Sequence, residues 1–279
     1  MLYPLDRGER FFLVNDRIFE TQEFATNMIP KGEVIYEVFR VVGSKPIFLR
    51  EHLDRLFKSC LKTGINCPTV EEFARNILNL LEKNPVSEKN LKISLFFDPD
   101  RLEFLQLLAY FIDSRYPTQA DYLNGIKLEM LPMERENPNV KLENPKMRGA
   151  AEKAICLSQT SEVLLVDKEG FITEGSRSNF FVLQKGIIIT PPSNVVLEGI
   201  TRSKVLNICK EQGIPLEIRK FHHSELQKID GAFITGTSPK VLPVNRIGDI
   251  ALTVGQPIIL QIMHSFDELF KAELSGNPT

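Results

Sequence analysis

Two side chains in the second half of the sequence could do chemistry on an aldehyde-bearing compound. Lys141 closes the stretch Asn139-Val140-Lys141, just outside an apolar element, and partial desolvation makes a lysine amine nucleophilic toward an aldehyde. Glu174 is expected in a turn between the apolar residues 171–173 and 180–183. A carboxylate there is costly to desolvate unless a positive or protonated group meets it. Each residue, taken alone, also fits an ordinary solvated side chain.

Two loops rich in hydrogen-bond donors follow these residues. Residues 199–202 read Gly-Ile-Thr-Arg, a glycine directly before an expected helix start, and helix N-termini bind anions through their first N–H groups. Residues 235–238 read Thr-Gly-Thr-Ser after an expected buried strand, and their amides and hydroxyls could wrap a phosphate. Either loop alone could be an ordinary connection, because the sequence has no P-loop or dinucleotide-binding glycine motif.

One cofactor accounts for all four features. It would carry an aldehyde for Lys141, a phosphate for the two loops and a protonated ring nitrogen for Glu174. Pyridoxal 5'-phosphate has these three groups. The sequence therefore predicts a binding site for pyridoxal 5'-phosphate.

The composition is that of a globular chain without a charged partner. Of 279 residues, 43% are hydrophobic and 25% are charged, and the formal net charge of -2 gives no reason to expect nucleic acid or a membrane surface. The four cysteines and four histidines show no metal-ligand spacing, so we expect reduced, buried thiols and no metal. Residues 1–10 are too charged for a signal peptide and no apolar run could span a membrane, so we expect a cytoplasmic protein.

The apolar pattern predicts a small α/β domain over residues 1–116. Residues 11–14 and 18–19 flank the turn Asn15-Asp16, and residues 34–42 and 46–49 flank Gly43-Ser44, so two hairpins are expected. A helix should run from about residue 50 to Gly64, and a second from the capping box Thr69-x-x-Glu72 to about residue 81. Strands should follow at residues 91–97 and 102–112.

A polar segment around Pro117 predicts a linker over residues 117–124, followed by a larger domain over residues 125–279. A helix should begin at Asn144-Pro145, where asparagine caps and proline fits the first turn. Its buried face should hold Met147, Ala150, Ala151, Ala154 and Ile155. Other helices are expected from Thr201 to Gly213, at the box Ser224-x-x-Gln227 and over 257–274, and strands at 126–131, 163–166, 171–173, 180–183, 187–189, 216–219, 232–234 and 241–244.

Six motifs stand in a recognisable order along the chain. They are Tyr36-Glu37-Val38-Phe39-Arg40, Glu51-His52-Leu53-Asp54-Arg55, Lys141-Leu142-Glu143-Asn144, Thr173-Glu174-Gly175-Ser176, Leu197-Glu198-Gly199-Ile200-Thr201-Arg202 and Thr235-Gly236-Thr237-Ser238. From Tyr36 to its end, the sequence resembles the fold-type IV, or class IV, pyridoxal-phosphate-dependent aminotransferases. That family includes branched-chain aminotransferases, D-amino acid aminotransferases and aminodeoxychorismate lyases.

The resemblance implies a fold and a role for each motif. The fold would be α/β (α+β), with a small N-terminal α/β domain, a larger C-terminal domain with a barrel-like sheet, and the cofactor between them. Members are homodimers whose sites borrow residues from the partner. Lys141 would be the Schiff-base lysine and Glu174 the partner of the ring nitrogen. The phosphate would be held by Arg55, the N–H groups of Ile200 and Thr201, and Thr237, while Ser238 of the same loop and Tyr36 would face the substrate.

The resemblance also implies an activity, with alternatives. The leading hypothesis is an aminotransferase that moves an amino group between an amino acid and a 2-oxo acid through the lysine Schiff base. A second is an aminodeoxychorismate lyase, which eliminates pyruvate and releases 4-aminobenzoate. A third, from another class, is a non-catalytic relative that binds pyridoxal phosphate or nothing.

The sequence departs from the family pattern in two places. Lys146 lies five residues after Lys141 and is an alternative Schiff-base lysine; we prefer Lys141 because Asn144 then follows three residues later. Branched-chain enzymes usually have a tyrosine near the position that Lys146 occupies, so the absence of this tyrosine weighs against that subfamily. Residues 91–97 and the turn after them lack the arginine and histidine with which D-amino acid aminotransferases hold the substrate carboxylate. Arg40, Arg101 and Lys240 are substitutes for holding the substrate carboxylate, and the sequence does not rank them. It also does not decide whether the Arg177 side chain faces the substrate, the partner subunit or solvent.

Overall fold

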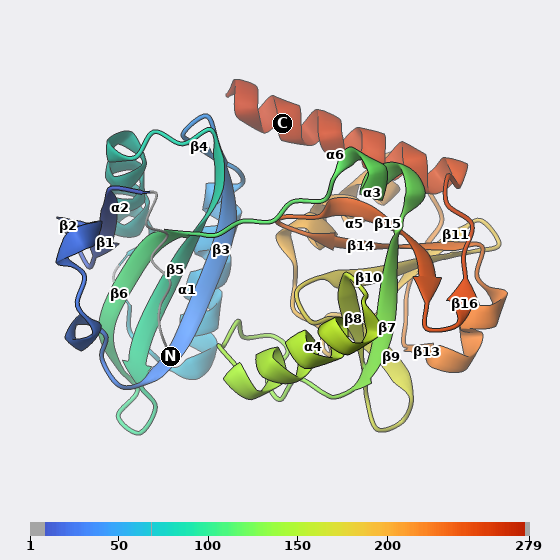
Figure 1. Ribbon diagram of the computed structural model, residues 1–279, viewed down its shortest axis with the longest axis horizontal. Coiled ribbons are helices and arrows are strands. Elements are labelled where there is room, and N and C mark those ends of the chain that lie inside the picture. The colour runs from blue at the N-terminus through green and yellow to red at the C-terminus, as the bar shows by residue number, and fades with distance from the viewer. Residues whose placement is uncertain (1–8, 68, 277–279) are drawn as a thin grey trace. The chain divides into compact units, whose positions relative to one another are not determined.

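The computed structural model describes residues 9–67 and 69–276. Contacts among them form two compact units (Figure 1). The first unit runs to Arg115 and also includes residues 140–143 and the chain from Glu273, while the second includes residues 116–139 and 144–272. Residues 1–8, on which much of the expectation about targeting rests, lie outside the described range.

The first unit is built on an antiparallel sheet whose described strands pair in the order β2-β1-β6-β5-β3-β4. They are β1 (Phe11–Val14), β2 (Arg17–Glu20), β3 (Glu33–Val42), β4 (Lys45–Pro46), β5 (Glu88–Asp98) and β6 (Glu103–Ile112), with the short 3-10 helices η1 (Thr21–Glu23) and η2 (Thr26–Met28) after β2. Both predicted hairpin turns are confirmed, but the return strand expected at residues 46–49 is only Lys45–Pro46, because Leu49 begins the next helix. Tyr36 lies opposite Ser94, and Val38 opposite Lys92. Side chains alternate along a strand, so Tyr36 and Lys92 share a face and Glu37 points to the other.

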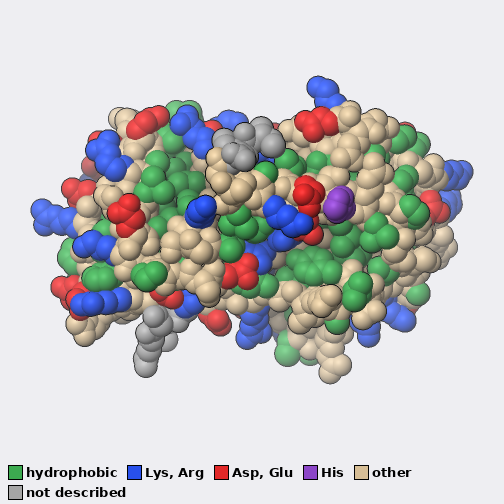
Figure 2. All heavy atoms as spheres, turned by 90° about the horizontal axis from the view of Figure 1, so that it is seen from above, with side chains coloured by type: hydrophobic (Ala, Val, Ile, Leu, Met, Phe, Trp, Pro, Cys, Tyr) green, Lys and Arg blue, Asp and Glu red, His purple; other side chains and the backbone are tan. Residues whose placement is uncertain are grey.

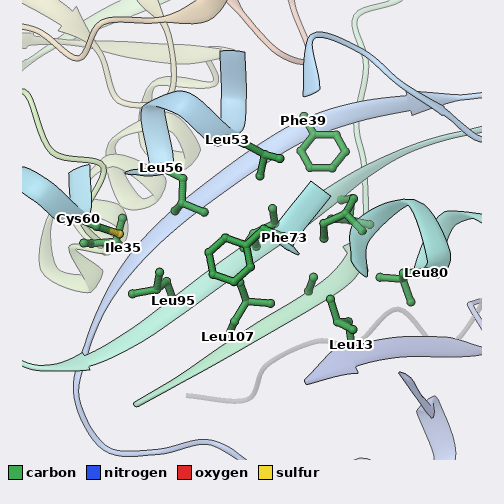
Figure 3. Close-up of a cluster of buried hydrophobic side chains, with 14 of the residues drawn as sticks. Leu13, Ile35, Phe39, Leu53, Leu56, Cys60, Phe73, Leu80, Leu95 and Leu107 are labelled. Atoms are coloured by element: carbon green, nitrogen blue, oxygen red, sulfur yellow. The ribbon is translucent and has the colours of Figure 1, made fainter. Parts of the chain in front are cut away.

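Helices α1 (Leu49–Thr63) and α2 (Val70–Lys83) supply side chains to the core on one face of this sheet. Figure 3 shows Leu53, Leu56 and Cys60 of α1 and Phe73 and Leu80 of α2 packed with Ile35, Phe39, Leu95 and Leu107 of the strands. Gly64 ends α1 at φ 76°, a left-handed conformation that glycine adopts without a Cβ clash. The Thr69–Glu72 capping box begins α2 as predicted.

The second unit is built on a mixed sheet whose described strands pair in the order β12-β11-β10-β14-β15-β7-β8-β9-β13, with β16 beside β15. Pairing is parallel between β7 and β8, between β7 and β15, and between β11 and β12. The α/β architecture predicted from the sequence is therefore confirmed. The strands are β7 (Ile126–Pro132), β8 (Glu162–Val166), β9 (Phe171–Gly175), β10 (Asn179–Gln184), β11 (Ile187–Thr190), β12 (Leu216–Ile218), β13 (Phe221–His222), β14 (Gly231–Gly236), β15 (Lys240–Ile247) and β16 (Ile250–Ala251).

The helices of the chain after β6 are α3 (Gln119–Asn124), α4 (Pro145–Ser158), α5 (Ile200–Glu211), the 3-10 helix η3 (His223–Lys228) and α6 (Pro257–Ser275). Helix α3 occupies most of the segment expected as a linker. The Asn144 cap of α4 is confirmed, because its side chain accepts from Met147 N at 2.9 Å. The predicted Ser224 box is wrong. His222 and Glu225 form the capping box of η3 instead.

The four cysteines do not all match the expectation of buried thiols. Cys60 and Cys209 are buried, but Cys67 is half-buried and Cys156 is exposed, so the expectation of buried thiols is wrong for Cys156. Across the described residues, no helix is long and apolar enough to cross a membrane, and no group of three or more His, Cys, Asp or Glu side chains could hold a metal. Figure 2 shows one face, on which basic and acidic side chains are interspersed.

Candidate active site

Glu174 lies inside strand β9, one residue before its end, and not in the turn where the sequence placed it. It is 2% exposed, so the alternative of a solvated carboxylate is wrong. Its Oε1 accepts from Arg135 Nε at 2.7 Å, and its Oε2 accepts from Leu197 N at 3.0 Å and from Asn179 Nδ2 at 3.3 Å. One positive charge and two amide donors thus compensate the burial of this carboxylate.

Arg135 is a site residue that sequence reasoning missed. Its side chain is 11% exposed and forms an ion pair with Glu174. It stands in the polar, proline-containing segment between β7 and α4, and no local sequence pattern distinguishes it from the charged residues beside it. The available signal was indirect, because a buried carboxylate requires a cation and the segment offered one.

The turn that follows β9 is anchored on Glu162, a buried residue at the start of β8. The Glu162 carboxylate accepts from Ser176 Oγ at 2.7 Å, from Arg177 N at 3.1 Å and from Ser178 Oγ at 3.3 Å. The Arg177 side chain is 54% exposed and pairs with Glu152 at 2.9 Å. The turn between β9 and β10 is therefore held by side-chain contacts as well as by its backbone hydrogen bond from Gly175 N to Ser178 O.

The loop before α5 presents the expected phosphate donors. Ile200 and Thr201 form the first turn of this 12-residue helix, and its N-cap, Gly199, makes no side-chain cap hydrogen bond. Nearby, Thr235 lies opposite Asn179 in the sheet, is 1% exposed, and has an Oγ1 without a hydrogen-bond partner in the described structure. An uncapped helix start beside an unpaired buried hydroxyl suits an anionic oxygen ligand. These residues fit the phosphate of the expected cofactor.

Thr237 and Ser238 lie in the turn between β14 and β15. Gly236 pairs with Lys240 across this turn, so three residues complete the hairpin. Lys240 takes up the left-handed conformation at φ 52°, as the residue that closes such a short hairpin often does. Both hydroxyl residues are half-buried, at the end of the strand that carries Thr235.

Gly199→Ala should destabilise the protein by about 1–3 kcal/mol, the usual cost of overpacking. An ideal Cβ on Gly199 would stand 2.0 Å from Asn179 Oδ1. Asn179 cannot swing away freely, because its Nδ2 is bonded to Leu197 O at 2.8 Å. Urea unfolding followed by circular dichroism measures the effect. Gly149→Ala in α4 is the control, since nothing lies within 4 Å of its added Cβ and alanine favours a helix. Equal effects of the two substitutions would contradict the steric account.

Lys141 belongs to a short extended segment that lies along β3. Lys141 O accepts from Tyr36 N at 2.9 Å, Glu143 N donates to Val34 O at 2.8 Å, and Leu142 forms a bridge with Ile35 between them. This backbone pairing groups residues 140–143 with the first unit, although they follow β7 in the chain. The main chain around the predicted Schiff-base lysine is therefore held on a rigid strand.

Tyr36 brings two ammonium groups together on its ring. Lys141 Nζ lies 5.0 Å and Lys92 Nζ 5.3 Å from the ring centroid, within the range of a cation–π contact. Lys92 also forms an ion pair with Glu143. Sequence reasoning missed Lys92, although a single charge within the apolar run of residues 91–97 was a signal. Lys146, the alternative lysine, is exposed in the first turn of α4.

Arg55 forms a buried cluster with Glu37 and His52. Its Nε and Nη2 donate to the two oxygens of Glu37 at 2.6 and 2.7 Å, and His52 Nδ1 lies 2.9 Å from Glu37 Oε2. Burial alone would raise the pKa of Glu37, but the Arg55 charge and the hydrogen bonds from Arg55 and His52 outweigh it and hold the pKa well below its usual range. Burial lowers the pKa of His52 despite the opposing effect of Glu37. A neutral His52 must then carry its proton on Nδ1 to donate to the carboxylate.

Glu37→Gln should flatten the acid end of the stability curve. The folded pKa of Glu37 lies below its ordinary value of 4.5, so the ionised carboxylate contributes stability above that value. The contribution is lost as pH falls below it, because the unfolded chain binds a proton that the folded chain does not. In this range, the free energy of unfolding of the wild type should fall by about 1.4 kcal/mol more per pH unit than that of the variant. Urea titrations between about pH 3 and pH 7 measure the difference.

Glu88→Gln serves as the control for the Glu37 prediction. Glu88 also pairs with an arginine, Arg40, but its side chain is 38% exposed. This variant keeps the buried cluster and should follow the wild-type slope. Parallel curves for wild type and Glu37→Gln would show that the cluster does not govern acid unfolding.

The three cations proposed for the substrate carboxylate occupy different settings. Arg40 is buried and donates from Nε to Glu88 at 2.8 Å. Lys240 pairs with Asp267 at 2.8 Å. The Arg101 side chain is 76% exposed on the turn after β5. Lys92, a cation that the sequence did not propose for this role, lies over the Tyr36 ring.

Comparison with known proteins gives one consistent family. The family model described as "Amino-transferase class IV" matches residues 34–247. A D-alanine aminotransferase of Bacillus licheniformis is 28% identical over 264 residues, 88% of this chain and 91% of the relative. The structure of the branched-chain aminotransferase of Thermoproteus uzoniensis with norvaline is similar at a TM-score of 0.83 and 22% identity, over 97% of each chain. A T.th. branched-chain amino acid aminotransferase with pyridoxamine 5'-phosphate gives 0.83 at 20% identity, over 96% of each chain.

Proposed function

Because the chain belongs to the class IV aminotransferase family, it is an aminotransferase, and we propose that it binds pyridoxal 5'-phosphate through the residues described above. The proposed substrates are an amino acid and a 2-oxo acid, as the relatives named for D-alanine and branched-chain amino acids suggest. When bound, the cofactor supplies a ring that withdraws electrons from the substrate's Cα. The protein's own side chains are proposed to bind and orient the cofactor and to move the protons.

Lys141 is proposed to hold the cofactor through Nζ until the substrate amine takes its place, and the freed amine would then carry the proton of the substrate's Cα as general base and afterwards as general acid. Its backbone pairing to β3 fixes the position from which the side chain extends. The Tyr36 ring, whose centroid is 5.0 Å from Nζ, limits where the amine can lie. Tyr36 is also proposed to face the substrate. Lys141 is preferred over Lys146 because Lys146 is exposed to solvent.

Glu174 is proposed to hold the proton of the ring nitrogen by ionic hydrogen bonding. Its two oxygens already accept three donors, which fix the direction of the carboxylate before any ligand arrives. Such preorganisation avoids a reorientation cost during the reaction. This buried, fully oriented carboxylate is the observation that carries the proposal.

The phosphate is proposed to bind the N–H groups of Ile200 and Thr201, with Thr237 adding a donor from the β14–β15 turn, while Ser238 of the same turn is proposed to face the substrate at the cofactor. Arg55 is proposed to add charge. Glu37 accepts from Nε and Nη2 of Arg55, and this bidentate contact would set the direction in which the guanidinium presents its charge.

One experiment tests the proposed function. Protein supplied with pyridoxal 5'-phosphate should develop an absorbance band near the visible edge, and borohydride should remove the band and leave the cofactor on Lys141, as found by peptide mapping. The same protein should transfer an amino group from an amino acid to a 2-oxo acid. Aminodeoxychorismate should be left unchanged. Absence of the band, or release of 4-aminobenzoate without amino transfer, would contradict the proposal.

Two expectations about the whole molecule stay predictions. A homodimer is expected from the resemblance, and sedimentation of the purified protein tests it. A cytoplasmic location, expected from the sequence, also stays a prediction.

A further inference from the structure

Asn179, the first residue of β10, is 5% exposed and contacts three parts of the second unit. Its Nδ2 donates to Leu197 O at 2.8 Å and to Glu174 Oε2 at 3.3 Å. Its Oδ1 lies 2.0 Å from the place where a Cβ on Gly199 would stand. Its backbone lies opposite Thr235, near the end of β14. Asn179 therefore links strand β9 and the segment that enters α5 through its side-chain amide, and it meets strand β14 through its backbone.

The peptide groups of Leu197 are held from both sides. Leu197 N donates to Glu174 Oε2 at 3.0 Å, while Leu197 O accepts from Asn179 Nδ2. Leu197 is two residues before Gly199, the N-cap of α5. The Glu174 carboxylate and the first turn of α5 are therefore connected through one residue, and the Asn179 amide closes the connection.

We propose that Asn179 is a positioning residue that fixes the spacing between the Glu174 carboxylate and the N-terminus of α5. The inference rests on the proposed function, in which Glu174 meets the ring nitrogen and the start of α5 meets the phosphate. Ring and phosphate are parts of one molecule, so both contacts reach full strength only when their protein partners keep the matching distance. Asn179 acts through these two partners.

Hydrogen–deuterium exchange of the ligand-free protein tests the positioning directly. In Asn179→Ala and Asn179→Asp, the Leu197 amide should exchange about 10-fold faster or more, because the hydrogen bonds from Asn179 Nδ2 to Glu174 Oε2 and Leu197 O that hold its donor–acceptor pair in place are lost. Aspartate also places a negative oxygen beside two acceptors. Unchanged exchange at Leu197 in both variants would overturn the inference, whatever the protein's reaction.

Asn245→Asp is the matched control. Asn245 lies in the same unit, and its Nδ2 also donates twice, to Asn124 O and to Gly125 O, both at 2.8 Å. The substitution removes an equivalent pair of hydrogen bonds from β15, away from the Glu174 network. Its exchange at Leu197 should equal that of the wild type, and acceleration there would show that general loosening of the unit explains the Asn179 result.

Ligand affinities separate positioning from a merely structural role. Binding of pyridoxal 5'-phosphate and of pyridoxal, which lacks the phosphate, is measured for the wild type and both Asn179 variants. We expect about a 10- to 100-fold loss for pyridoxal 5'-phosphate and less than about a 3-fold loss for pyridoxal. An unchanged ratio of the two affinities would overturn the inference and leave the proposed function standing. A wild-type protein that binds neither compound would overturn the proposed function, and the exchange measurement would still decide the role of Asn179.

Discussion

Replacing Lys141 with alanine should reduce the rate of amino transfer by at least about 10³-fold, since both nucleophile and proton carrier are lost. The fold should tolerate the change, because the segment is held by backbone pairing of Lys141 O and Glu143 N to β3. Steady-state kinetics with an amino acid and a 2-oxo acid measure the loss. The melting temperature should stay within a few degrees of the wild type, which shows that the effect is chemical.

Lys146→Ala is the discriminating comparison for this prediction. Lys146 is exposed in the first turn of α4, so its removal should change turnover less than about 2-fold and leave the borohydride label in place. A label on Lys146, or a larger loss for Lys146→Ala than for Lys141→Ala, would overturn the assignment of the Schiff-base lysine.

Glu174→Gln should lower kcat by about 10²–10³-fold, because a neutral amide cannot stabilise a protonated ring nitrogen as a carboxylate does. The glutamine keeps the shape of the side chain and one oxygen for Leu197 N. The affinity for pyridoxal 5'-phosphate, much of which comes from the phosphate, should therefore fall less than about 10-fold. Titration of the absorbance band and steady-state kinetics separate the two effects.

Glu174→Ala should behave differently from Glu174→Gln. Both substitutions remove the negative charge that pairs with Arg135, whose side chain is 11% exposed, but alanine also removes every acceptor for Arg135 Nε and Leu197 N, so alanine should come nearer to the cost of about 3–5 kcal/mol for breaking a buried ion pair. Glu198→Gln, one residue beyond Leu197 and exposed, is the control for loss of a carboxylate in this region. If Glu174→Gln kept wild-type turnover, Glu174 would be a structural partner of Arg135 and not the partner of the ring.

Much of the fold follows from local signals in the sequence. The caps at Thr69 and Asn144, the glycine that ends α1, and the alternation along β3 each depend on residues within a few positions of one another. Backbone sterics and short-range hydrogen bonds decide these features. The Ser224 box was wrong because two overlapping capping boxes fit that stretch. The structure uses the earlier one, in which the His222 imidazole accepts from Ser224 N.

The order of the six motifs is also a property of the sequence, and it was sufficient to predict the family. The sequence placed Glu174 among apolar residues and so required a positive partner. It did not name that partner, since Arg135 lies 39 positions away and a separation of that size has no pattern along the chain.

The tertiary structure alone decided which groups meet. Strand pairing put Lys92 and Tyr36 on one face of a sheet and placed Lys141 along β3, where chain order suggested a residue of the second domain. Packing of α1 on the same sheet closed Arg55 onto Glu37. These contacts are set by long-range pairing and by the need to compensate buried charge. The sequence by itself therefore determined which residues could do the chemistry, and the folded chain determined what holds each of them in place.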